Sequence, residues 1–436
     1  MKIQPIYFAT PVYYSKENFL ADAAVLDGFI RGLDDSPADV APALYVHSRQ
    51  ELAAFLAARP DVLPLVVACS GGTQKWILEA VKAYGQALLW IYYPNDSIYS
   101  EGTAAAVTAV MARNAMPAVV DTWAHLRNRG LAVEKVFDRA SYAAEKGLFA
   151  ALAAIRRARL LVVGYTQQWV VSASVDQRKI EDKFGIQTVH IGLEELLAEF
   201  AKTPATPAGA EFARRYLAGA KSCVEPSAAQ VEDAYRMYLA LSALLNRYEC
   251  DSLAISCFSL VANTGVTSCL ALSLLNDAPG TVAACEGDLD AAVSMIIGKK
   301  LTGRPVFMGN PVFNRDDTLD LVHCTAPRAL LGGVQPYEVR SHHETGKSVA
   351  QRIEVAAGQT ATIFRVGNEF AEATLYTAAL VDNPRLDTCR TQFRFKIDSS
   401  DRRFEELLGC HQLVVFGDHE AKLRRALTKY LGVAVR

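Results

Sequence analysis

The sequence predicts an α/β protein: two doubly wound parallel-sheet domains followed by a smaller, β-rich, barrel-like C-terminal domain. Three observations support this prediction. Short apolar runs that end in polar turns and lead into helical periodicity recur through the first 150 residues, and the same pattern restarts near residue 158. After about residue 325 the texture changes to alternation with period two. A chain of 436 residues is also longer than one hydrophobic core usually serves.

The first domain is expected at residues 1–153. The apolar run 63–69 (LPLVVAC) leads into SGGT and then into a helical pattern, and the run 87–93 (ALLWIYY) leads into PNDS and a second helical pattern. Strand, polar turn and helix in repetition are typical of a parallel sheet covered by helices.

The second domain is expected at residues 154–324. Strands are predicted at 158–165 (ARLLVVGY), 184–192 (FGIQTVHIG), 251–257 (DSLAISC) and 281–285 (TVAAC). A polar, proline-rich stretch (KTPATPAG) and a long helical pattern separate the second strand from the third. This order again indicates a doubly wound sheet.

The third domain is expected at residues 325–436. The stretches VAQRIEVAAGQTATIFRVG, EATLYTAALVD and QFRFKI alternate apolar and polar residues and are broken by Gly, Asn and Pro. This texture favours antiparallel strands in a small barrel or sandwich. The final stretch HEAKLRRALTKYLG predicts a helical tail.

Composition narrows the classes of partner. A formal net charge of −2, with 51% hydrophobic and 21% charged residues, gives no broad cationic surface for nucleic acid or for a membrane. No apolar stretch approaches the roughly 18 residues of a membrane span, and the opening segment lacks the features of a signal peptide. We therefore expect a small-molecule ligand or a second copy of the chain as partner.

The cysteines predict a reducing environment. There are nine, an odd number, with no CxxC pair, and most stand in apolar runs such as those that end at Cys69, Cys257 and Cys285. Buried, reduced thiols are the expected state, which indicates a cytoplasmic protein.

The segment EGDLDAA (286–292) carries the strongest functional signal. Glu286 stands just past the carboxyl end of the strand TVAAC, and from Leu289 onward apolar residues recur at helical spacing. Ligands bind at the carboxyl ends of strands in open α/β sheets. Asp288 and Asp290 also suit the first turn of a helix through its dipole, so an ordinary helix start remains an open alternative for them.

The longer segment ACEGDLDAAVSMIIGKKLTGRPVFMGNP resembles the L-fucose and L-arabinose isomerase family, in its shorter, divergent branch. The motifs SGGT, VVGYTQQWVVSASVD, LVHCTAP, RSHHETG with TATIFRVG, and LGCHQLVVFGD have counterparts in the same order along the chain. The resemblance implies an enzyme that interconverts aldoses and ketoses through an enediol, using Mn²⁺ or a similar divalent cation.

The family's site residues map onto four positions. The resemblance places the first metal-binding acid at Glu286, the second acid at Asn310, the metal-binding histidine at His411 and a further active-site histidine at His323. It thus implies Glu286, Asn310 and His411 as metal ligands, and Glu286, Asn310 and His323 as catalytic residues. We expect the four side chains to converge on one pocket. A hard divalent cation prefers carboxylate oxygens and tolerates imidazole.

Asn310 departs from the family pattern. An amide carries no charge and cannot take a proton at neutral pH, so the cation is expected to be held weakly, and one of two bases is missing. Asp288, Asp316 and Glu344 are candidate replacements for the missing acid. Three functions stay open: a metal-assisted isomerase or related enolising enzyme, a divergent lyase or epimerase, and a sugar-binding protein that has lost the chemistry.

Further candidates are expected to contact the substrate. Arg340 and His342 in RSHHETG suit sugar hydroxyls, a phosphate or a sulfonate, although a solvated loop would also explain them. SGGT at 70–73 is either a structural turn or an anion cradle at a helix start. The resemblance also implies a closed homo-oligomer, trimeric or hexameric, in which Trp76 and Tyr99 of one subunit stack on sugar in the next. Core packing is the alternative for both aromatic residues.

Overall fold

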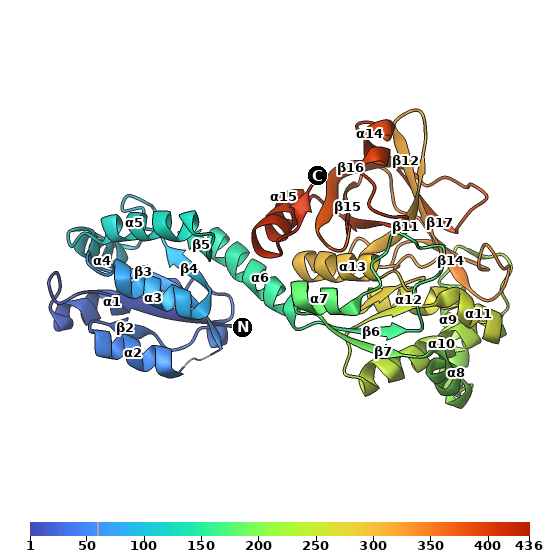
Figure 1. Ribbon diagram of the computed structural model, residues 1–436, viewed down its shortest axis with the longest axis horizontal. Helices are drawn as coiled ribbons and strands as arrows, with labels where there is room; N and C mark the ends of the chain where they lie inside the picture. The colour runs from blue at the N-terminus through green and yellow to red at the C-terminus, as the bar shows by residue number, and fades with distance from the viewer. Residues whose placement is uncertain (59–60) are drawn as a thin grey trace. The chain divides into compact units, whose positions relative to one another are not determined.

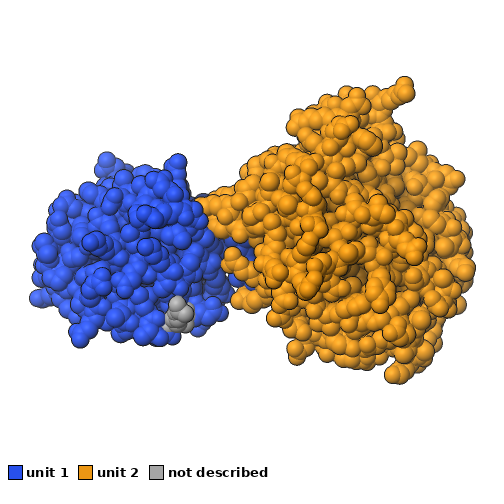
Figure 2. Space-filling model, viewed as in Figure 1, with its two compact units in different colours: residues 1–153 blue, residues 154–436 orange. Residues whose placement is uncertain are grey.

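The computed structural model describes residues 1–58 and 61–436. The chain divides into two compact units, residues 1–153 and 154–436 (Figure 2). The first unit has the bounds predicted for the first domain, and the second unit contains both the central α/β part and the β-rich part. Figure 1 shows the order of the elements along the chain.

The first unit is a parallel sheet with strand order β2-β1-β3-β4-β5. Its central strand β3 is buried along its whole length, which explains its continuous apolar run. The strands are β1 (Lys2–Phe8), β2 (Leu44–Val46), β3 (Val62–Ala68), β4 (Gln86–Trp90) and β5 (Ala132–Val136). The helices are α1 (Lys16–Arg31), η1 (Pro37–Asp39), α2 (Arg49–Ala58), α3 (Gln74–Tyr84), α4 (Glu101–Met111), α5 (Ala115–Asn128) and α6 (Arg139–Arg156).

The second unit begins with a parallel sheet of order β10-β9-β6-β7. The strand order reverses between β6 and β9, and such a switch point is where ligands bind in open α/β sheets. The strands are β6 (Arg159–Val163), β7 (Gln187–Ile191), β9 (Ser252–Ile255) and β10 (Val282–Ala284). The helices are α7 (Gln177–Phe184), α8 (Leu193–Lys202), α9 (Pro207–Ala218), α10 (Ala228–Arg247), α11 (Cys257–Thr264), α12 (Cys269–Asp277) and α13 (Leu289–Thr302).

The β-rich part contains a closed antiparallel barrel. Its strand order is β15-β18-β11-β12-β17-β16, and pairing of β15 with β16 closes the ring. The strands are β11 (Phe307–Phe313), β12 (Thr318–His323), β15 (Thr360–Gly367), β16 (Glu372–Asp382), β17 (Thr391–Lys396) and β18 (Gln412–Phe416), and β19 (Ala434–Val435) adds to β16. A small sheet joins β8 (Ser222–Cys223), β13 (Tyr337–Arg340) and β14 (Ala350–Ile353), and the remaining helical pieces are α14 (Ser400–Glu405), α15 (Glu420–Arg425) and η2 (Ala426–Tyr430). The α/β class with a barrel-like C-terminal part is therefore confirmed.

The barrel starts earlier in the chain than the period-two texture indicates. β11 and β12 both precede residue 325, and their partners β18 and β17 lie far ahead in the sequence. PVFMGNP follows a helix and is apolar, so its local pattern is that of a strand in the preceding parallel sheet. The expected helical tail consists of two pieces, α15 and η2.

Helix α13 explains why the α/β part and the barrel form one unit. Nearly all its residues are buried, including the polar ones, because the helix packs against β9 and β10 of the parallel sheet and against β15 and β18 of the barrel (Figure 1). A Cβ atom at Gly298 would lie 2.6 Å from Cζ of Phe364, so glycine permits the close approach of helix and barrel.

No disulfide joins the nine cysteines within the described part of the chain, and six of them are buried. In residues 1–58 and 61–436, no single helix is long and apolar enough to cross a membrane, although α4 and α5, bent by 73° at their junction, reach the required length and composition together.

Candidate active site

Glu286 occupies a constrained turn at the switch point of the second sheet. Its φ is +57°, an unusual value for a residue with a side chain and one often found at functional sites. The backbone N–H of Gly287 donates to the carbonyl of Ile255 at the end of β9 (2.9 Å), and the N–H of Gln167, after β6, donates to the carbonyl of Glu286 (2.9 Å). The loops that follow β6 and β9 therefore fix Glu286 between them.

Gly287 allows the loop after β6 to approach this turn. Its φ is +60°, and a Cβ atom would lie 2.6 Å from the carbonyl oxygen of Tyr165 and 2.9 Å from Cα of Thr166. The Thr166 hydroxyl donates to the Gly287 carbonyl at 2.8 Å. Only glycine fits here, which accounts for the Glu-Gly pair directly after the strand.

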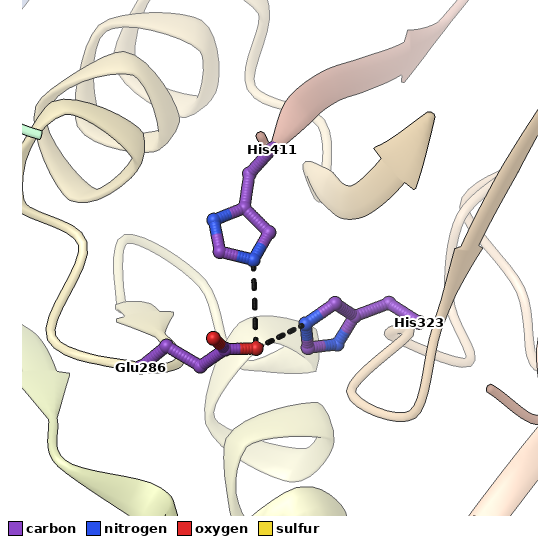
Figure 3. A group of neighbouring side chains, drawn as sticks. All are labelled: Glu286, His323 and His411. Carbon is purple, nitrogen blue, oxygen red and sulfur yellow. Dashed lines mark ion pairs between the residues drawn. The ribbon is translucent and has the colours of Figure 1, made fainter. Parts of the chain in front are cut away.

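Three predicted residues converge on one point. The Oε1 atom of Glu286 lies 3.8 Å from Nε2 of His323 and 3.6 Å from Nε2 of His411 (Figure 3). Glu286 comes from the β10–α13 turn, His323 from the end of β12, and His411 from the residue before β18. Their side chains are 11%, 4% and 0% exposed, respectively. The fold thus brings an acid of the α/β part against two imidazoles of the barrel.

His411 is held with Nε2 toward Glu286. Its Nδ1 lies 2.8 Å from Oδ2 of Asp288, and its Nε2 is buried without a hydrogen-bond partner among the described residues. Asp288 also caps α13 by accepting from the N–H of Ala291 (2.9 Å). Arg365 donates to both oxygens of Asp288, at 2.9 and 3.1 Å, and to the His411 carbonyl at 2.9 Å. A carboxylate behind an imidazole in this way is typical of metal-binding histidines.

Two further contacts orient the cluster. His323 Nδ1 lies 2.9 Å from the Thr325 hydroxyl, which leaves Nε2 to face Glu286. The indole N–H of Trp169 donates to Oε2 of Glu286 at 2.6 Å, although the Trp169 side chain is large and 54% exposed. One carboxylate oxygen is thus held by the indole, while the other faces the two imidazoles.

The charges of the cluster follow from its contacts. Burial alone would raise the pKa of Glu286, but the adjacent imidazoles of His323 and His411 hold it well below the usual value. Burial also opposes ionisation of Asp288, yet Arg365 and His411 keep its pKa low. Burial would lower the pKa of His411, but its carboxylate neighbours raise it well above the usual range. Both acids are therefore ionised at neutral pH.

The donor set fits a divalent cation. The ligand atoms of Glu286, His323 and His411 lie within 4.8 Å of one another, a spread that one ion bonded at about 2.0–2.4 Å to each can span after small shifts. The unpartnered Nε2 of His411 points into this space. A carboxylate with two imidazoles suits Mn²⁺, Zn²⁺ or a similar ion.

Asn310 lies close to His323, because their strands, β11 and β12, are paired. It is half-buried on β11 and pairs with Val322, the residue before His323. Within the described residues, the hydrogen bonds of the cluster do not include the Asn310 amide, so its part as a ligand stays a prediction. Of the three acids considered as replacements, Asp316 is exposed in the β11–β12 turn and Glu344 pairs with His342, whereas Asp288 contacts His411 directly.

Arg340 and His342 lie outside the cluster. Arg340 forms an ion pair with Glu225 at 2.7 Å, so its guanidinium is already engaged. His342 is buried, and the Phe258 ring contacts both its imidazole and the indole of Trp169, at centroid distances of 5.6 and 4.9 Å. Phe258 thus links His342 to Trp169, the residue whose indole holds Glu286.

The remaining candidates belong to the first unit. Tyr99 is buried and its ring packs on Phe29 at 5.2 Å, while Trp76 is half-buried on α3. In the SGGT turn, Ser70 Oγ accepts from the N–H of Thr10 (3.0 Å) and the Thr10 hydroxyl donates to the Gly71 carbonyl (3.1 Å). These contacts tie the loops after β1 and β3 together. Ligand binding by these residues stays a prediction.

Trp169, Thr325 and Arg365 are not among the site residues predicted from the sequence. Arg365 has a weak signal in the sequence, because it stands in the run TATIFRVG, where the residues beside it are buried. A charge at such a position predicts a buried counter-ion, here Asp288. Nothing in the local sequence marks Trp169 as a partner of Glu286.

Asp290 adds a pH-sensitive carboxyl beside the cluster. It is fully buried, accepts from the N–H of Ser174 (3.1 Å) and lies 3.8 Å from Arg365, with Oδ2 unbonded among the described residues. Burial and repulsion from Asp288 raise the pKa of Asp290 to about 6. The attraction of Arg365 opposes this shift only in part.

We expect Asp290→Asn to remove a pH-dependent loss of stability. The folded-state pKa of Asp290 exceeds that of an unfolded chain, so its contribution to stability is fully present below about pH 4 and is lost as pH rises through about 6. Relative to the variant, the wild type should lose roughly 2–3 kcal/mol of unfolding free energy between these pH values. Urea unfolding at about pH 4 and about pH 7 measures this. An equal difference between the two proteins at both pH values would contradict it.

Comparison with known proteins finds similarity over part of the chain. No family model matches the chain. The chain is 27% identical over 216 residues to a sulfoquinovose isomerase from Clostridium sp. (strain MSTE9), and this match covers 48% of the chain and 48% of the relative. The matched segment thus spans about half the length of the curated relative.

Proposed function

We propose that the chain is a metal-assisted sugar isomerase that moves a proton between neighbouring carbons of an aldose or ketose. The main supporting observation is the position of Glu286 at the sheet switch point, with Oε1 3.6 and 3.8 Å from two imidazole Nε2 atoms. The similarity to a sugar isomerase points to the same class. Sulfoquinovose, the substrate in the relative's name, is one candidate sugar.

Glu286 and His411 would hold the divalent cation, with the Asn310 amide or His323 as a further ligand. A bound divalent cation polarises a sugar carbonyl and makes the neighbouring C–H more acidic. With one carboxylate facing the ion instead of two, the affinity for Mn²⁺ should be modest.

The chain's own residues supply binding and proton transfer. The ionised carboxylate of Glu286 takes the proton from the carbon beside the carbonyl and returns it to the neighbouring carbon, so that aldose and ketose differ only in the position of hydrogen. His323 Nε2 faces the same space and can exchange a proton with a sugar hydroxyl. The exposed part of Trp169 offers an apolar surface to the sugar ring while its N–H holds Glu286.

A direct assay tests this function. Purified protein with Mn²⁺ is incubated with a panel of aldoses, sulfoquinovose among them, and the products are followed by NMR in D₂O. Formation of the matching ketose supports the proposal, and deuterium on the reacting carbons supports an enediol. A C2 epimer would indicate an epimerase, a carbonyl fragment a lyase, and binding without conversion a sugar-binding protein. Each of these three outcomes would overturn the isomerase proposal.

Asn310→Asp tests the effect of the missing acid. We expect Mn²⁺ affinity to increase about tenfold, because a charged ligand replaces a neutral dipole. Turnover should rise or hold if the site is an isomerase with a weakened metal. A fall in turnover would show that the reaction needs a neutral group at this position. Calorimetric titration with Mn²⁺ measures the affinity. Asn128→Asp, which adds the same charge at an exposed position of the first unit, is the control. Unchanged Mn²⁺ affinity in Asn310→Asp would exclude residue 310 from the metal site.

A further inference from the structure

A second group of metal-ligating side chains lies outside the Glu286 cluster. The Sγ atom of Cys324, a ring nitrogen of His342 and a carboxylate oxygen of Glu344 lie within 4.8 Å of one another. Cys389 adds a second thiol, with Sγ 3.3 Å from Oε1 of Glu344. These residues come from the end of β12, the β13–β14 loop and the segment before β17. Three separate segments thus bring four ligand-type side chains together.

The side chains of this group are oriented and largely buried, as in a binding site. His342 Nδ1 lies 3.0 Å from the Thr345 hydroxyl, and this contact leaves Nε2 to face Oε2 of Glu344 at 3.0 Å. Cys324, Cys389 and His342 are only 2%, 7% and 7% exposed. The Glu344 side chain is 40% exposed, so the group opens to solvent on one side, where an ion can enter. The hydroxyl behind the imidazole corresponds to the outer partner that metal-binding histidines usually have.

We propose that Cys324, Cys389, His342 and Glu344 form a zinc site. Two thiolates, one imidazole and one carboxylate complete the tetrahedral coordination that Zn²⁺ prefers. Soft sulfur ligands disfavour Mn²⁺, so Mn²⁺ is expected at the oxygen- and nitrogen-based Glu286 cluster and not at this site. Zinc binding releases the two thiol protons to solvent, and no redox step is involved.

The site has a structural role beside the candidate active site. Cys324 directly follows His323, so an ion on Cys324 fixes the end of β12, from which the active-site imidazole extends. The same ion ties the β13–β14 loop and the segment before β17 to that strand end. All four ligands are positioning residues. The inference does not depend on isomerase chemistry at Glu286.

Simple burial explains this group less well. The buried cluster that contains Cys324 and Cys389 also includes a third thiol, Cys269, and the apolar residues Val322 and Ala350. A core of this kind needs no imidazole and carboxylate facing the thiols. Cys257 and Cys285 lie 3.2 Å apart beside the group, since Cys257 and His342 line the same small pocket, but the imidazole of His342 pairs with Glu344 and not with these thiols. A disulfide between thiols is the competing outcome that the experiment must separate.

Cobalt substitution tests the proposal on the full-length protein. The protein is stripped with chelator under reducing conditions and titrated with Co²⁺, whose thiolate complexes give a charge-transfer band that oxygen and nitrogen ligands do not give. We expect the band in the wild type, in Glu286→Gln and in the control Cys250→Ser, a half-buried thiol outside the group. We expect its loss in Cys324→Ser and Cys389→Ser. Glu344→Gln, at a partly exposed position, should weaken Zn²⁺ binding about tenfold while the fold is kept.

The cobalt and zinc measurements can either support or overturn the proposed zinc site. One zinc per chain that is retained in Glu286→Gln, together with the thiolate band, supports it. Cobalt binding without this band in folded wild-type protein would overturn it. So would a disulfide at Cys324 in protein kept under reducing conditions, detected by non-reducing mass spectrometry. Circular dichroism of each variant checks folding, and the wild-type spectrum alone remains decisive if a cysteine variant unfolds.

Discussion

Glu286→Gln is expected to lower turnover by about 10²–10⁴-fold, the range that a positioned acid–base group contributes. Glutamine keeps the shape of glutamate and can still accept the hydrogen bond from Trp169. It cannot take a proton at neutral pH and lacks the charge that would hold the cation. Initial rates of aldose–ketose conversion at saturating Mn²⁺ measure the effect.

The control removes a carboxylate that has no part in the site. Glu181→Gln lies on the exposed face of α7 and should leave the rate near that of the wild type. The thermal stability of both variants should be compared, because Glu286 lies in a strained turn. Wild-type turnover in Glu286→Gln would remove this residue from the mechanism.

Asp288→Asn is expected to destabilise the second unit by about 3–5 kcal/mol, the cost of breaking a buried ion pair. Asparagine caps a helix as well as aspartate does, so the change isolates the charge from the cap of α13. Arg365 would stay fully buried, with Asp290 at 3.8 Å as its remaining counter-ion. The loss of the carboxylate behind His411 should also weaken metal binding about 10–100-fold. Urea unfolding and calorimetric titration with Mn²⁺ measure the two effects.

Asp320→Asn provides the matched comparison. Asp320 is also fully buried and pairs with an arginine, Arg394, at 2.6 Å, but the Arg394 side chain is 27% exposed, whereas Arg365 is fully buried. The charge left behind at Arg394 stays partly solvated, so the loss should be smaller. Equal losses in the two variants would contradict the account of Asp288 and Arg365.

The sequence predicts the fold where the local residue pattern matches the kind of sheet in which a strand pairs. Apolar runs followed by helical periodicity define the two parallel sheets, and period-two texture defines β15, β16 and β17. β11 was harder, because its partners β12 and β18 are antiparallel strands and β18 lies about 100 residues later. An apolar strand after a helix has the same local signal in either kind of sheet. The start of the barrel therefore depends on tertiary pairing.

The candidate site was predictable in part. Glu286 is marked by its place after a buried strand, but His323 and His411 were selected through the family resemblance, because neither has a local signal. The role of Asp288 behind His411 depends on a contact across 123 positions. Trp169 lies in a loop whose approach to Glu286 depends on Gly287. Contacts between residues so far apart in the sequence depend on tertiary packing and cannot be inferred from local residue spacing.

The central claim is that Glu286, His323 and His411 surround a divalent cation at the switch point of the second sheet. Anomalous diffraction from a crystal soaked with Mn²⁺ tests it most directly. We predict one strong manganese peak within about 2.0–2.4 Å of Oε1 of Glu286 and Nε2 of His411. A crystal saturated with Mn²⁺ that shows no peak at these atoms, or a peak on other ligands alone, would contradict the claim.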